Sequence, residues 1–203
     1  MPSFPDVVAI ASRNEHKLRE IRRICPDWPV RWLTMLDPAA EPWPDVEETG
    51  ATYLDNASLK ARTVAAALGV PALADDSGIE VDALGGKPGV RSARFAGEHA
   101  TDEQNLRELI RSVAGIPAGG RTARYRCVAV LAFPAEDEEV HAEAVCEGAL
   151  VRKPRGGAGF GYDPIFVPAG WDRTMAELTD VEKDRISHRG RAFRALRDVL
   201  ATG

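Results

Sequence analysis

The chain has 203 residues, of which 44% are hydrophobic and 28% charged, and its formal net charge is -5. These values are ordinary for a globular protein and allow one large domain or two lobes around a shared core. The acidic balance argues against general binding to nucleic acid, and no apolar run approaches the roughly 20 residues of a membrane span.

The cysteines indicate the cellular compartment. Cys25, Cys127 and Cys146 are odd in number, have apolar neighbours and form no Cys-x-x-Cys pair. We therefore expect reduced, buried thiols in a cytoplasmic protein without a zinc site. The first residues also lack the basic and apolar regions of a secretion signal.

Apolar periodicity outlines the start of the chain. A continuous apolar run predicts a buried strand at residues 7–11, and apolar residues at helical spacing then predict a helix that stops before Pro26. Residues 26–46 are rich in proline and tryptophan, which predicts irregular structure with a short strand at 30–35. Thr52, with Asp55 as a capping box, predicts a second helix that Gly69 ends.

Residues 74–78 read Ala-Asp-Asp-Ser-Gly between two apolar runs, which predicts a tight turn between two strands. The adjacent carboxylates of Asp75 and Asp76 repel each other unless a cation or hydrogen-bond donors lie beside them. A surface turn without function is one interpretation. The other is a site for a divalent metal and a phosphate.

The second half mixes helices with long strands. Capping boxes at residues 101–104 and 179–182 predict helix starts, and apolar residues around Phe193 predict a last helix. Residues 125–133 and 139–151 predict two long strands joined as an antiparallel hairpin. The alternation of helices and strands predicts an α/β fold with a mixed sheet.

Two polar segments before the acidic pair suit phosphate. The predicted helix start after residue 11 offers free backbone amides, with Ser12, Asn14 and Lys17 close by, although an ordinary helix cap with an exposed lysine explains the same residues. Glu48 precedes the second helix, on which Lys60 lies. These two residues either face a polyphosphate or belong to a solvated charged face.

Two further segments suit a planar ligand. Glycines flank Phe160 at residues 159–164, so the backbone there can approach a base on which the ring stacks; a β-bulge whose aromatics serve the core is the alternative. His188 and Arg189 can donate hydrogen bonds to a base edge. The alternative is an ordinary start of a helix, with Ser187 as its cap.

Together these segments resemble one family, the inosine triphosphate pyrophosphatases or dITP/XTP diphosphatases. The resemblance runs from Val7 to Leu200. Seven motifs carry it in order, at residues 12–17, 47–50, 56–62, 74–78, 88–94, 159–166 and 187–190.

The resemblance implies an elongated α/β fold in which residues 1–203 form a single domain of two lobes. A long mixed sheet flanked by helices would join the lobes, with the active site in the cleft between them. It also implies a homodimer, a Mg²⁺ requirement, a purine nucleoside triphosphate substrate and no nucleic-acid or membrane partner. The implied reaction splits dITP, ITP or XTP into the monophosphate and pyrophosphate.

By motif match, Glu48 and Asp76 would bind the metal, and Asp76 would also be the general base. Asp75 would support the predicted turn or contact a residue that itself binds the metal or substrate. The remaining matched positions would bind substrate: Ser12, Arg13, Asn14, Glu15, His16, Lys17, Lys60, Ser77, Phe160, Gly161, Tyr162, Asp163, Lys183, His188 and Arg189.

The chain departs from the family pattern at three positions. Arg13 and Ala158 stand where glycine is common, and Asp55 where glutamate is common. An arginine at position 13 predicts either a clash, if the backbone there has positive φ, or an added phosphate contact. Two other functions stay open: hydrolysis of pyrimidine or modified nucleotides, and nucleotide binding without turnover.

Overall fold

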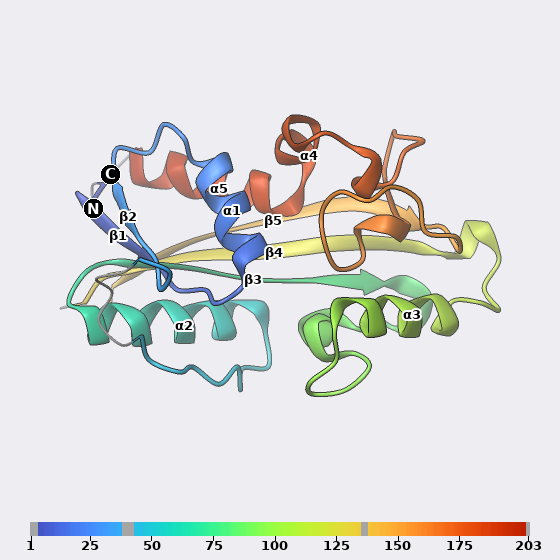
Figure 1. Cartoon of the computed structure of the whole chain (residues 1–203), viewed down its shortest axis with the longest axis horizontal. Coiled ribbons are helices and arrows are strands. Elements are labelled where there is room, and N and C mark those ends of the chain that lie inside the picture. Colours follow the sequence, from blue (N-terminus) through green and yellow to red (C-terminus); the bar gives the residue numbers. More distant parts are fainter. Residues whose placement is uncertain (1–3, 38–42, 135–137, 202–203) are drawn as a thin grey trace. The chain divides into compact units, whose positions relative to one another are not determined.

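A computed structural model describes residues 4–37, 43–134 and 138–201. Helices and strands alternate as far as residue 132, after which two more strands and then two helices follow (Figure 1). In chain order they are β1 (Val7–Ile10), α1 (Glu15–Ile24), β2 (Arg31–Leu33), α2 (Tyr53–Leu68), β3 (Ala72–Val81), α3 (Asp102–Ser112), β4 (Thr122–Ala132), β5 (Glu139–Leu150), β6 (Phe166–Pro168), α4 (Asp180–Ile186) and α5 (His188–Ala201).

The strands form one sheet in the order β2-β1-β3-β4-β5-β6. β1 pairs in parallel with both β2 and β3, whereas β5 and β6 are antiparallel. β4 and β5 are neighbours with only residues 133–138 between them, too few for the crossover of about a dozen residues that a parallel pair requires. The expected mixed sheet flanked by helices is therefore confirmed.

The predicted helix boundaries follow from capping chemistry. The Thr52 hydroxyl accepts from the Asp55 amide while the Asp55 carboxylate accepts from the Thr52 amide, and Gly69 ends α2 in the left-handed conformation. Thr101 and Thr179 open α3 and α4 with the same reciprocal pattern. These caps satisfy amides that the first helical turn leaves without partners, which is why short-range sequence predicted them.

The chain forms two compact units. Unit 1 takes the residues up to Asp76, Cys127–Ala144 and the chain from Arg189 onward; unit 2 takes Ser77–Arg126 and Val145–His188. Within unit 1, α1 and α5 lie on one face of the sheet and α2 on the other (Figure 1). Each unit has its own apolar core, the first including Ile10, Ile21, Leu73, Phe193 and Leu196, the second including Ile79, Leu109, Tyr125, Phe166 and Met175.

The acidic segment is not a turn. Ala72–Val81 is one continuous ten-residue strand, so the prediction of a tight turn at residues 74–78 was wrong. Asp75 and Asp76 are 2% and 5% exposed within it. A buried strand tolerates two charges only where partners compensate them, and those partners come from distant parts of the chain.

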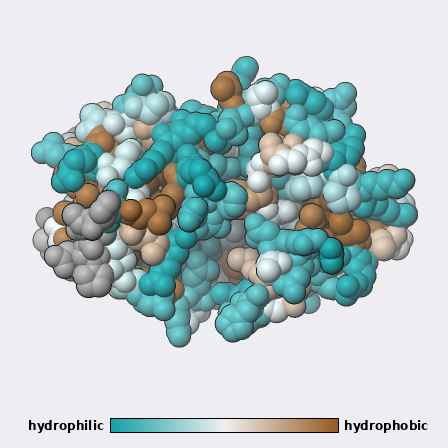
Figure 2. Space-filling view, in the orientation of Figure 1, coloured by the Kyte–Doolittle hydropathy of each residue, from teal (hydrophilic) through white to brown (hydrophobic). Residues whose placement is uncertain are grey.

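The face of the molecule in Figure 2 is mostly hydrophilic, with apolar residues in small separate areas. Among the described residues, none of the helices has the length and apolar character needed to cross a membrane.

All three cysteines are buried and none is in a disulfide. Burial raises the pKa of Cys25 to about 12, against a smaller opposing effect of Arg197, and burial also raises the pKa of Cys127. Because the thiolate is the reactive form, we expect the native protein to resist iodoacetamide at pH 8. Mass spectrometry should show no adduct on native protein and three after denaturation; an adduct on Cys127 in the native protein would contradict its burial.

Candidate active site

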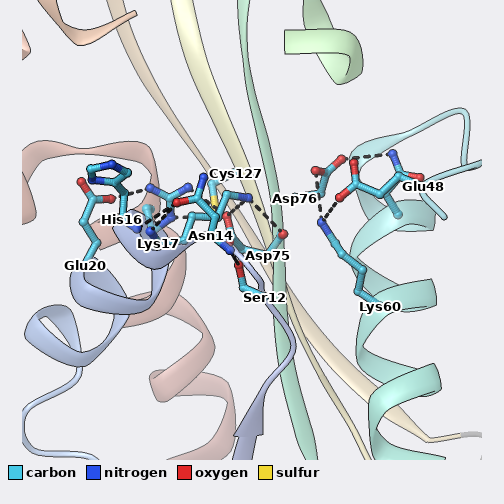
Figure 3. A network of polar contacts seen from close by, with 12 residues as sticks. Ser12, Asn14, His16, Lys17, Glu20, Glu48, Lys60, Asp75, Asp76 and Cys127 are labelled. Atoms are coloured by element: carbon cyan, nitrogen blue, oxygen red, sulfur yellow. Dashed lines mark hydrogen bonds and ion pairs between the residues drawn. The ribbon is translucent and has the colours of Figure 1, made fainter. Parts of the chain in front are cut away.

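Asp75 and Asp76 point to opposite faces of β3, because successive side chains of a strand alternate. Figure 3 shows Asp75 directed toward Lys17 of α1, while Asp76 is directed toward Lys60 of α2. Both clusters lie within unit 1. One dipeptide therefore supplies a carboxylate to two separate charge clusters.

The Asp76 cluster joins three charged groups. The Lys60 ammonium lies 2.6 Å from Glu48 Oε1 and 3.4 Å from Asp76 Oδ1, so both carboxylates converge on one point. Asn56 completes the cluster by donating from Nδ2 to Asp76 Oδ2 at 3.2 Å while its Oδ1 accepts from the Gly50 amide at 2.7 Å. A Cβ on Gly50 would come within 2.6 Å of Asn56 Oδ1, so glycine allows the loop that carries Glu48 to pack onto α2.

The charges of this cluster are not fully balanced. Burial raises the pKa of Asp76; Lys60 and Lys17 oppose that rise, Glu48 adds to it, and the hydrogen bond from Asn56 opposes it. Burial alone would lower the pKa of Lys60, but Asp76, Glu48 and Asp75 outweigh it and raise that pKa. The ionised Asp76 carboxylate is thus under-compensated by the chain itself.

The cluster fits a magnesium ion that takes few ligands from the protein. Within the described residues there is no group of three or more His, Cys, Asp or Glu side chains arranged to hold a metal. Mg²⁺ characteristically uses one or two carboxylates and completes its shell with water and substrate phosphate. The converging oxygens of Glu48 and Asp76, together with the under-compensated charge of Asp76, match that requirement.

The Asp75 cluster is a buried ion network. The Arg189 guanidinium donates to Asp75 Oδ2 from both Nε and Nη2, at 3.3 and 3.0 Å, and Nη1 donates to Glu20 Oε2 at 2.5 Å. Lys17 Nζ lies 3.2 Å from the same Asp75 oxygen. Burial disfavours the charge on Asp75, but Arg189, Lys17 and Lys60 outweigh it and hold its pKa well below the usual range.

Arg189 therefore lies in a different setting from the one its motif suggested. Its side chain is 2% exposed and binds two carboxylates of unit 1. The contacts described favour a role in fixing Asp75 and Glu20, while contact with a base stays a prediction.

The start of α1 is capped by its own side chain. Asn14 Oδ1 accepts from the amides of His16 and Lys17 at 2.9 and 3.2 Å, and Ser12 Oγ accepts from the Asn14 amide at 3.2 Å. The ordinary cap is thus present, with Lys17 brought beside Asp75 in addition.

Three further predicted phosphate residues are exposed at this helix start. Arg13 pairs with Asp45 at 3.2 Å, and Arg19 contacts both Glu15 and His16. No non-glycine residue in the described part of the chain has positive φ, so Arg13 fits this loop without backbone strain.

Unit 2 holds a third cluster, around Asp163. Lys183 Nζ donates to Asp163 Oδ2 at 2.6 Å, and the Phe160 amide donates to the same oxygen at 3.0 Å. The ammonium of Lys183 also lies 5.2 Å from the centre of the Phe160 ring. A Cβ on Gly159 would approach Asp163 Oδ2 to 2.1 Å, so this loop needs glycine there to pass the ion pair.

The remaining predicted residues of unit 2, apart from Ser77, border this cluster or lie near it in sequence. The Tyr162 hydroxyl donates to the Ser92 carbonyl at 2.7 Å, and the Gly161 amide donates to Asp102. His188 is 6% exposed and stacks on Tyr125. Ser77 follows Asp76 in β3.

Three residues with important contacts were absent from the predicted site. Asn56 had a sequence signal, because it shares a helix face with Lys60. Glu20 and Tyr125 had none: their partners, Arg189 and Asp163, are remote in the sequence.

The comparisons with known proteins identify the family of the chain. Residues 8–199 match the model of the Ham1 family. The chain is 44% identical over 200 residues to a dITP/XTP pyrophosphatase of Shigella flexneri, covering 97% of this chain and 98% of the relative, and 48% identical over 191 residues to one of Streptomyces coelicolor, covering 94% and 95%.

Solved structures show the same relationship. A HAM1 protein from Coxiella burnetii superposes with a TM-score of 0.85 at 39% identity, covering 97% of this chain and 99% of the other. A dITP/XTP pyrophosphatase from Mycobacterium abscessus has a TM-score of 0.74 at 44% identity, covering 94% and 98%. With matches over nearly its full length in both sequence and structure, the chain belongs to the Ham1 family.

Proposed function

We propose that this protein is a Mg²⁺-dependent pyrophosphohydrolase that cleaves dITP, ITP and XTP to the monophosphate and pyrophosphate. In the cell it would remove deaminated purine nucleotides from the precursor pool. The observation that carries the proposal is the Glu48–Lys60–Asp76 cluster, in which two carboxylates converge beside a buried ammonium. Relatives named dITP/XTP pyrophosphatase support the substrate class.

Four charged groups of unit 1 would have a role in this reaction. Lys17 and Lys60 would neutralise phosphate oxygens, which matters because charge on those oxygens dominates the barrier to phosphoryl chemistry. Asp76 would orient the attacking water and accept its proton. Glu48 and Asp76 would hold Mg²⁺, which supplies further charge neutralisation on the phosphates when bound.

The Asp163 cluster of unit 2 supplies groups for reading a base. Hypoxanthine and xanthine present a carbonyl oxygen at C6 and an N1–H donor, whereas adenine presents an amino donor at C6 and an acceptor at N1. Lys183 and His188 would donate to the C6 oxygen, and Phe160 would stack on the ring. A buried donor facing the adenine amino group costs about 1–3 kcal/mol, roughly ten- to a hundred-fold in rate.

A substrate panel with and without EDTA tests the proposal. We expect rapid pyrophosphate release from ITP, dITP and XTP, at least about tenfold slower release from ATP, and loss of activity in EDTA that Mg²⁺ restores. GTP should also react more slowly, but guanine shares the C6 oxygen and N1–H of hypoxanthine, so its rejection must come from contacts at C2. Release of orthophosphate, or equal use of ATP, would contradict it.

The same panel, extended with dUTP and 5-methyl-UTP and with a measurement of ITP binding, decides between the alternatives. Preferential turnover of dUTP or 5-methyl-UTP would indicate a pyrimidine or modified-nucleotide enzyme. Tight ITP binding without product would indicate a nucleotide-binding regulator. A homodimer stays a prediction of the family resemblance, and a cytoplasmic location stays a prediction from the cysteine pattern.

A further inference from the structure

Tyr125 of β4 joins two predicted base-recognition groups. Its hydroxyl donates to Asp163 Oδ1 at 3.2 Å. Its ring stacks on His188, with ring centres 4.5 Å apart and planes inclined by 8°. Tyr125 is 7% exposed, and the edge of the Phe166 ring fixes it further at 4.7 Å between centres. One buried, rigid side chain thus contacts an acceptor and an imidazole of the same unit.

The hydroxyl of Tyr125 orients the Asp163 carboxylate. The other oxygen of that carboxylate, Oδ2, accepts from Lys183 Nζ and the Phe160 amide, so a donor on Oδ1 fixes the rotation of the carboxylate plane. The direction of the Lys183 ammonium and the position of the Phe160 loop then follow from that plane. Stacking on the Tyr125 ring similarly restricts the tilt of the His188 imidazole.

We infer that Tyr125 is a positioning residue that sets selectivity for 6-oxopurines over 6-aminopurines. This inference rests on the proposed function, since it assigns Asp163, Lys183 and His188 to base recognition. A site discriminates between two hydrogen-bond patterns only if its donors and acceptors cannot turn to suit the wrong one. Tyr125 restricts the rotation of both groups: its hydroxyl holds the Asp163 carboxylate, and its ring holds the His188 imidazole.

Tyr125→Phe separates the two contacts, because it removes the hydroxyl and keeps the stacked ring. We expect its dissociation constant for IMP, measured by calorimetry, to rise about tenfold, the loss expected for one hydrogen bond. The dissociation constant for AMP should change less than about twofold, so the ratio of the AMP constant to the IMP constant should fall. Tyr125→Leu, which removes the stack as well, should lower that ratio further.

Thr122→Val is the matched control. Thr122 lies on the same strand and donates its hydroxyl to the Asp82 carboxylate at 2.7 Å, away from the Asp163 cluster. Its substitution also removes a hydroxyl bound to an aspartate, so IMP and AMP binding should both match the wild type.

The outcomes separate this inference from the proposed function. An unchanged IMP-to-AMP preference in Tyr125→Phe, or equal weakening of both ligands with a lower melting temperature, would show a merely structural role and overturn the inference. A wild type without preference for IMP would overturn it too. Failure of the wild type to release pyrophosphate from ITP refutes the proposed activity alone, because the binding measurements need no turnover.

Discussion

Replacing Asp76 with asparagine is expected to reduce pyrophosphate release from ITP by at least about 10³-fold, because it removes the proposed general base and one proposed metal ligand. The same change should leave the melting temperature unchanged or raise it. Burial raises the pKa of Asp76 in the folded chain, so its ionised form costs stability at neutral pH. The amide oxygen of the variant can still accept from Asn56.

Asp75→Asn is the matched variant, one residue away. Here we expect a lowered melting temperature, because the Arg189 guanidinium loses the charge it faces at 3.0 Å. Turnover should fall far less than in Asp76→Asn. Measured side by side, steady-state rates and thermal unfolding should therefore separate the two aspartates. If Asp75→Asn were inactive and Asp76→Asn active, the general base would be Asp75, and the assignment to Asp76 would be wrong.

Arg189→Met is expected to cause the largest loss of stability, about 3–5 kcal/mol, because it removes the guanidinium from two buried carboxylates. In a chain of this size each kcal/mol lowers the melting temperature by about 2–4 °C. Circular dichroism during heating measures the change. Glu20→Met combined with Arg189→Met should recover part of the loss, since one of the two buried negative charges is then gone.

An exposed pair provides the control for Arg189. Arg111 lies 2.7 Å from Glu108, but its side chain is 76% exposed, so Arg111→Met should change stability by less than about 1 kcal/mol. If both arginine variants unfold at the wild-type temperature, the buried network is not stabilising the chain.

The loss in Arg189→Met should also depend on pH with a definite sign. The pKa of Asp75 is lowered in the folded chain, so its contribution is fully present above its unfolded value of about 4 and is lost as pH falls through the folded value. A protonated Asp75 no longer needs its partner. The gap between wild type and variant should therefore be widest above about pH 4 and should narrow in more acidic solution.

Sequence predicted best what is decided locally. The caps at Thr52, Thr101 and Thr179 were correct because each helix start is satisfied by a residue three positions away. Residues named from the motifs also lie together in the structure: Glu48, Lys60 and Asp76 form one cluster, and Asp163 pairs with Lys183 in another.

The misread strand shows what local sequence could not supply. Two adjacent aspartates followed by serine and glycine have the composition of a turn. β3 can continue through this segment because residues distant in the sequence compensate the two carboxylate charges. Arg189 is 114 positions from Asp75, and Lys60 is 16 positions from Asp76. The same distance hid the true setting of Arg189 and the link from Tyr125 to Asp163.

The doubled aspartate in β3 also makes the effects of insertion and deletion asymmetric. Slipping the strand by one residue in one direction would put Asp75 in the place of Asp76 and leave Ala74 opposite Arg189. Slipping it the other way would keep a carboxylate for Arg189 and put Ser77 beside Lys60. The first slip would keep a carboxylate beside Lys60 but none for Arg189, and the second would keep one for Arg189 but none beside Lys60; both would also move the apolar residues of β3 to the opposite face. Because the two aspartates are adjacent, a slip by one residue in either direction leaves a carboxylate in one of the two clusters.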